Sequence, residues 1–109
     1  MGRLLYGSDG QSLDIDDRAL AHLRVVFMNK LRRAEPFLFH HSEPNGHRSL
    51  WIHPAVPIVF HFYGSRQPAL NRAWVEHLMN AASGPHGLSV LPEPPPSSSI
   101  VAGTDEQAV

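Results

Sequence analysis

Residues 37–52, FLFHHSEPNGHRSLWI, decide the fold class because they have the pattern of a β-hairpin. Residues of strand-forming type stand on both sides of Glu43-Pro44-Asn45-Gly46, and an Asn-Gly pair is typical of a tight hairpin turn. This turn places Phe39 opposite Leu50 and Ser42 opposite His47, with successive side chains on opposite faces. The face that we expect to enter the core consists of Phe37, Phe39, Leu50 and Ile52.

Further strands are predicted on both sides of this hairpin. RLLY (3–6) and QSLDID (11–16) flank the turn Gly7-Ser8-Asp9-Gly10 and form a second hairpin. VPIVFHFYG (56–64) is the strand that follows the first hairpin, and Pro54 and Pro57 confine the connection to a turn or a sheet edge. GLSVL (87–91) is a last short strand.

Two helices interrupt the strands. Leu20, Leu23, Phe27 and Leu31 are spaced as one face of a helix over residues 17–33, and Asp16 and Asp17 provide its N-cap and first-turn charge. Asn71 caps a second helix, which Gly84-Pro85 ends. The order ββαβββαβ predicts an α+β fold with a mainly antiparallel sheet of about six strands.

The bulk composition describes one small domain followed by a tail. We expect residues 1–91 to fold as a single α+β domain, and the Pro-, Ser- and acid-rich residues 92–109 to form a disordered tail. The net charge is −1, and without the acidic tail the folded part is mildly basic. Cysteine is absent, no apolar run is long enough to span a membrane, and no signal peptide is visible, so we expect a cytoplasmic protein.

Several short motifs occur in an order that resembles a known family. They are LYG, DDRALAHLRVV with KLRR, LWIHP, GSRxPxLNxxW, LM, GL and PEP, and together they span roughly residues 3 to 95. The sequence resembles a family of small uncharacterised bacterial proteins that are often automatically named ATP-dependent DNA ligase. The resemblance implies at most an accessory module that works near a ligase.

The chain lacks the catalytic core of a ligase. A nucleotidyl-transferring ligase of that kind needs a lysine in a K-x-D-G context, but the single lysine, Lys30, lies in NKLRR. The Asp9-Gly10 pair has Gly7 where that lysine would stand. We therefore expect no adenylylation by this chain.

The eight histidines do not form a recognisable metal site. No HExxH motif is present, and adjacent His40 and His41 point to opposite faces of a strand. Ser8, Ser65 and Ser83 lie in glycine-containing turns but lack the G-x-S-x-G context of a nucleophile elbow. The sequence therefore indicates no catalytic residue, no metal ligand and no cofactor.

The predicted sheet has a second face that is aromatic and rich in imidazole. Trp51 and His53 lie on it in one strand, and His61 and Tyr63 in the next. Such a face fits cover by the second helix, burial against another subunit or protein partner, or stacking of nucleic-acid bases. The sequence leaves these three alternatives open.

The junction GSRQPALN, residues 64–71, is another candidate binding region. Arg66 and Arg72 lie beside the helix start at Asn71, where backbone amides attract anions. They fit either an anion site or a loop in which Arg66 braces backbone carbonyls.

Two functional hypotheses follow. In the first, the chain is a non-catalytic accessory module that binds DNA or a DNA-processing protein, with phosphate contacts from Arg18, Arg24, Arg32, Arg33, Arg66 and Arg72. In the second, it is a homo-oligomeric or partner-binding module that buries Trp51 and Tyr63, without a nucleic-acid role.

Overall fold

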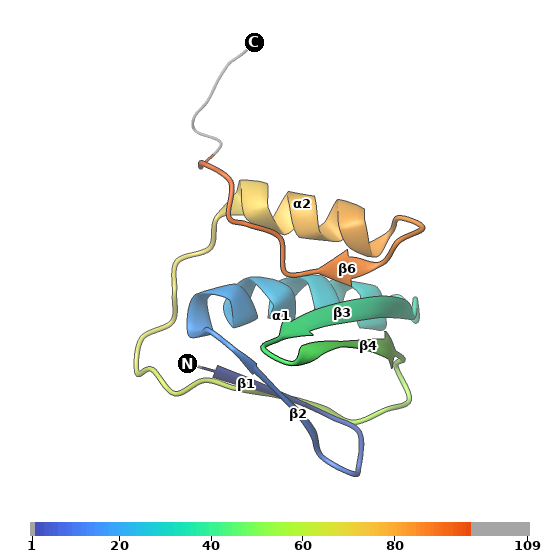
Figure 1. The fold of residues 1–109 in the computed structure, drawn as a ribbon. Helices are drawn as coiled ribbons and strands as arrows, with labels where there is room; N and C mark the ends of the chain where they lie inside the picture. The colour runs from blue at the N-terminus through green and yellow to red at the C-terminus, as the bar shows by residue number, and fades with distance from the viewer. Residues whose placement is uncertain (1, 97–109) are drawn as a thin grey trace.

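The computed structural model describes residues 2–96 and has two helices and six strands within them (Figure 1). The α+β class and the order ββαβββαβ are confirmed. The elements are β1 (Gly2–Tyr6), β2 (Gln11–Ile15), α1 (Asp17–Arg32), β3 (Phe37–Glu43), β4 (Gly46–Ile52), β5 (Ile58–His61), α2 (Arg72–Ala82) and β6 (Leu88–Ser89). The part of the predicted tail from residue 97 onward lies outside the described residues.

The six strands form two three-stranded sheets and not the single sheet that we expected. One sheet has the order β2-β1-β5 and is antiparallel; the other has the order β4-β3-β6, with β6 parallel to β3. The connection after β4 explains the division. The backbone N–H of Val56 donates to the carbonyl of His53 in a turn, and the next residue, Pro57, accepts from Gly7 at 2.9 Å, so β5 joins β1.

The hairpin of residues 37–52 has the predicted register. Phe39 lies opposite Leu50 and Ser42 opposite His47. All four side chains of the predicted core face are buried. Pro44 and Asn45 form the turn, and Gly46 already pairs with Glu43. The alternating pattern favours this register because a shift by one residue would expose the whole apolar set.

Helix α1 packs against both sheets. The ring of Phe27 makes edge-to-face contacts with Phe37 and Phe39 of one sheet at centroid distances of 5.0 and 5.3 Å, and with Phe60 of the other at 5.7 Å. The predicted N-cap is also present, since the carboxylate of Asp16 accepts from the backbone N–H of Ala19 at 2.7 Å. The core therefore lies between α1 and the two sheets.

Side-chain donors join the two sheets along the outer edge of β2. Arg48 Nη2 donates to the carbonyl of Ser12 at 2.7 Å, and His41 Nε2 lies 3.1 Å from the carbonyl of Asp14. These contacts satisfy backbone groups that an edge strand leaves unpaired. A third connection lies near the other end of β4, where the hydroxyl of Tyr6 donates to the carbonyl of Trp51.

The C-terminal part of the described chain crosses the first turn of α2. After β6 the backbone passes along α2, which lies beside α1 and runs in the same direction (Figure 1). We predicted the end of the folded domain at Leu91, but Glu93 and Pro94 also contact the helices. No helix among residues 2–96 combines the length and apolar character that a membrane crossing requires.

Candidate functional site

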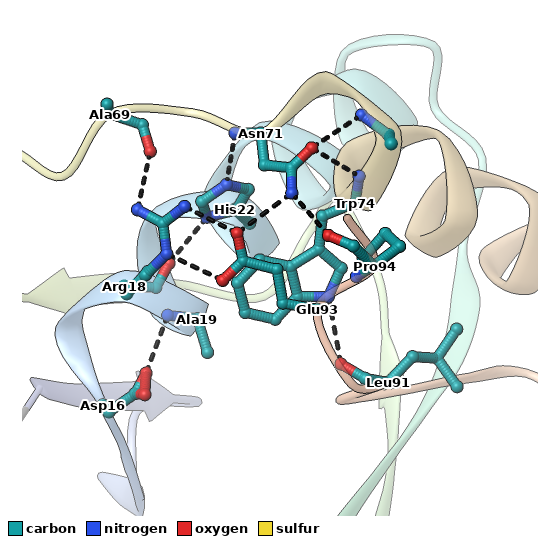
Figure 2. A network of polar contacts seen from close by, with 11 residues as sticks. Asp16, Arg18, Ala19, His22, Ala69, Asn71, Trp74, Leu91, Glu93 and Pro94 are labelled. Atoms are coloured by element: carbon teal, nitrogen blue, oxygen red, sulfur yellow. Dashed lines mark hydrogen bonds and ion pairs between the residues drawn. The ribbon is translucent and has the colours of Figure 1, made fainter. Parts of the chain in front are cut away.

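The polar network shown in Figure 2 connects the first turns of α1 and α2 with the segment after β6. Its centre is an ion pair between Arg18 and Glu93. The Arg18 guanidinium donates from Nε to Oε1 of Glu93 at 2.8 Å and from Nη2 to Oε2 at 2.6 Å, and its Nη1 donates to the carbonyl of Ala69 at 2.9 Å. This bidentate fork is a strong and directional way to hold a carboxylate.

Asn71 is the second donor to the same carboxylate. Its side-chain Nδ2 donates to Oε2 of Glu93 at 3.0 Å and to the carbonyl of Pro94 at 2.9 Å. Its Oδ1 accepts from the backbone N–H groups of Ala73 and Trp74, which makes Asn71 the N-cap of α2 as predicted. One amide side chain thus starts the helix and binds the C-terminal segment.

A buried histidine–tryptophan pair lies next to Asn71 and Arg18 and contacts the backbone of both residues. The His22 ring is fully buried and stacks on Trp74 with the ring centroids 4.5 Å apart. His22 Nδ1 lies 2.7 Å from the carbonyl of Arg18, and its Nε2 accepts from the backbone N–H of Asn71 at 2.8 Å. The indole N–H of Trp74 donates to the carbonyl of Leu91 at 3.0 Å.

The electrostatics of the network favour a carboxylate at this position. Hydrogen bonds from Arg18 and then from Asn71 lower the pKa of Glu93 from 4.5 to about 2. The same contact raises the pKa of Arg18 above its ordinary value. The arrangement binds the carboxylate of Glu93 from the same chain.

The network contains two of the predicted anion-binding residues, Arg18 and Asn71. The Arg24 guanidinium lies over the ring of Phe62, 4.7 Å from its centroid. Arg66 and Arg72 are exposed. Within residues 2–96 no hydrogen bond links Arg66 to a backbone carbonyl, and its role stays a prediction. The carbonyl of Ala69 in this loop accepts from Arg18 instead.

The four predicted aromatic and imidazole residues do not share one sheet face. Trp51 is exposed on β4, and His53 follows that strand, where its Nδ1 accepts from the backbone N–H of Ala55. His61 and Tyr63 lie on and just beyond β5, with ring centroids 4.4 Å apart. The expectation of one common face fails because β5 pairs with β1 and not with β4.

Among residues 2–96, no three His, Cys, Asp or Glu side chains lie close enough together to hold a metal ion. His40 bonds to Ser49 and to the carbonyl of His86. His41 packs between the sheets, with Nδ1 3.5 Å from a carboxylate oxygen of Glu43. Both imidazole rings therefore contact other groups of the fold.

Sequence reasoning missed three members of the network: His22, Trp74 and Glu93. The helical pattern of the sequence does not distinguish His22 and Trp74 from other residues of the two helices. Glu93 was assigned to the tail because its neighbours are prolines. The available signal was the PEP motif, residues 92–94, which lies within the resemblance described above.

Comparison with protein families shows which family the chain belongs to. The family model described as Domain of unknown function (DUF7882) matches residues 1–93, which include Arg18, His22, Asn71, Trp74 and Glu93 of the network. The chain belongs to the DUF7882 family. The match gives the DUF7882 domain no link to DNA ligase names, and it ends at the carboxylate that Arg18 binds. No curated protein and no solved structure matches the chain.

Proposed function

We propose that this domain is a non-catalytic protein-interaction module that binds a second polypeptide chain along β5. The observation that carries the proposal is an unpaired strand edge bordered by exposed apolar side chains. Strand addition to such an edge is a common mode of protein recognition.

The backbone geometry identifies the groups that a partner strand would meet. Pro57 accepts from Gly7, so hydrogen-bonded pairs recur at alternate positions along the β1–β5 ladder. By this alternation, the N–H and C=O groups of Ile58 and Phe60 point away from β1. In the part of the chain that the structure describes, no strand pairs with them.

The outward sheet face next to this edge carries two exposed side chains with large apolar surface, Val59 and Tyr63, with exposed His61 between them and Arg3 opposite His61. Phe60 and Phe62 contact α1, so the alternate residues face away from the helix. On that outward face the exposed fractions of Val59 and Tyr63 are 51% and 54%, and Leu5 lies opposite Val59 in the β1–β5 register. Exposed side chains of this size beside an open edge favour burial by a partner.

The experiment is sedimentation velocity of the purified chain across a micromolar concentration series. We expect concentration-dependent association of the natural chain and loss of association for Val59→Lys, because a lysine would have to be desolvated in the interface. Met28→Lys, on the exposed side of α1, is the matched control and should associate normally. A natural chain that stays monomeric and captures no partner strand would contradict the proposal.

The exposed arginines support DNA binding as a second candidate. Arg32, Arg33, Arg66 and Arg72 are exposed, and none of them has an ion-pair partner within residues 2–96. The end of α1, with Arg32, and the start of α2, with Arg72, lie at opposite ends of the helix pair, which weakens this candidate (Figure 1). DNA binding that weakens with salt, and less steeply after Arg66→Ala/Arg72→Ala, would support it.

A further inference from the structure

In every hydrogen bond between the helix side and residues 91–94, the helix side donates and the segment accepts. The helices provide the donors: the Trp74 indole, the Asn71 amide and the Arg18 guanidinium. The segment Leu91-Pro92-Glu93-Pro94 provides two backbone carbonyls and one carboxylate as acceptors (Figure 2). Proline has no backbone N–H, so a proline-flanked segment leaves few donors unsatisfied when it binds such a surface.

Each donor side chain also has a contact outside the segment. The Arg18 guanidinium is fixed by the carbonyl of Ala69. Asn71 is fixed by its capping contacts with α2 and by His22, and Trp74 by its stacking on His22. A binding surface whose side chains are already positioned loses little conformational entropy when a ligand arrives.

The segment itself is held at a solvent-exposed place. Pro92 and Glu93 are exposed, and Leu91 is the one half-buried apolar side chain packed against the core from this segment. The side chains of Arg18 and Glu93 are 43% and 32% exposed, so water and other carboxylates compete for this ion pair. A peptide with the same chemistry can therefore replace the segment.

We propose that the Arg18–Asn71–Trp74 surface is a receptor for an extended apolar-Pro-Glu-Pro segment of another protein, and that residues 91–94 occupy it as an internal competitor. The guanidinium of Arg18 selects for the carboxylate of the segment. The indole of Trp74 and the amide of Asn71 bind its two backbone carbonyls. This mode resembles the recognition of proline-rich segments by aromatic-lined grooves. The site is separate from the β5 edge, and the two proposals are independent.

The test uses the full chain with Glu93→Ala and the synthetic peptide acetyl-VLPEPP-amide. Chemical shifts of the assigned Trp74 indole N–H and Asn71 side-chain amide report binding. We expect the peptide to bind the variant about tenfold more tightly than the natural chain, since a tethered competitor has a high effective concentration. The peptide acetyl-VLPQPP-amide should bind the variant about tenfold more weakly, because the charged fork contact is lost.

A second variant distinguishes recognition from general loosening of the fold. Adding Arg18→Lys to Glu93→Ala keeps the positive charge but removes the fork, so the preference for the Glu peptide over the Gln peptide should shrink. Adding Arg72→Ala instead should leave this preference unchanged. The proposal is overturned if the peptide binds both chains equally, if the two peptides bind equally to the Glu93→Ala chain, or if no binding occurs at millimolar peptide.

Discussion

The backbone N–H of Asn71 donates to Nε2 of the fully buried His22 across 2.8 Å. The Nδ1 atom of the same ring lies 2.7 Å from the carbonyl of Arg18, which can only accept, so Nδ1 carries the proton. A single neutral imidazole therefore joins the first turn of α1 to the start of α2. Both ends of this bridge reach the residues that bind Glu93.

His22→Phe tests this bridge. Phenylalanine fills a similar volume but cannot accept from Asn71, so a buried N–H loses its partner. We expect the free energy of unfolding to fall by about 2 kcal/mol, a typical cost of an unsatisfied buried donor. Urea denaturation measures it, and His77→Phe on the exposed side of α2 should leave the value unchanged. Equal effects of the two substitutions would show that the bridge contributes nothing.

We predict that Glu93→Gln changes how the stability of the folded protein depends on pH. The folded-state pKa of Glu93 is about 2, below its ordinary 4.5, because Arg18 and Asn71 bind the ionised form. Its contribution is therefore complete above pH 4.5 and is lost as the pH falls toward 2. We expect the stability difference between the natural chain and Glu93→Gln to shrink over this interval in denaturation curves. A constant difference from pH 6 to pH 2 would be the opposite result.

Local sequence signals predicted the elements of this fold well, but not how they assemble. The turn between Glu43 and Gly46 fell where the sequence predicted it, and Asp16 and Asn71 capped the helices where expected, because turns and caps depend on near neighbours. The division into two sheets arises because β5 pairs with β1. This pairing joins residues more than fifty positions apart in the sequence. Alternation of side chains does not specify such a partner.

The candidate site was only partly predictable for the same reason. Arg18 and Asn71 were recognised as residues able to bind an anion, but the anion was expected from outside. Glu93 lies 75 positions after Arg18, in a proline-rich stretch without periodicity. Composition alone assigned it to the tail, because a single tertiary contact leaves no local pattern.

Lys30 is expected to be protected from amine-reactive reagents while the protein is folded. Its side chain is buried, and Nζ donates to Ser83 Oγ at 3.2 Å and pairs with Glu35 at 3.1 Å. Since it is the single lysine, side-chain acylation by an N-hydroxysuccinimide ester reports its exposure directly. We expect labelling, followed by peptide mass spectrometry, to become at least about tenfold faster in denaturing urea. Rapid labelling of the native chain would contradict this burial.

Tyr6→Phe tests the hydroxyl that joins the two sheets. Tyr6 OH donates to the carbonyl of Trp51 at 2.6 Å and accepts from the backbone N–H of His53 at 2.9 Å. Removing one oxygen leaves both backbone groups without this partner, so we expect a loss of about 1–2 kcal/mol in the free energy of unfolding. Tyr63→Phe is the matched control, because Tyr63 is exposed and its hydroxyl makes no hydrogen bond within residues 2–96.

Asn71→Asp separates the two roles of Asn71. Aspartate keeps an oxygen that caps α2 and adds a negative charge, which the helix N-terminus favours. It cannot donate to Glu93 or Pro94, and it places a second carboxylate beside the first. We therefore expect α2 to remain intact while residues 91–94 detach.

Hydrogen exchange measures the two effects separately. In Asn71→Asp the Trp74 indole N–H, which is bonded to Leu91, should exchange faster, while the amides within α2 keep their protection. Asn71→Ala lacks the cap as well, and it should lower the free energy of unfolding by about 1 kcal/mol in addition to freeing the segment. If both variants destabilise α2 equally, the capping oxygen and the amide donors do not act independently, and the C-terminal segment is part of the helix start and not a ligand bound to it.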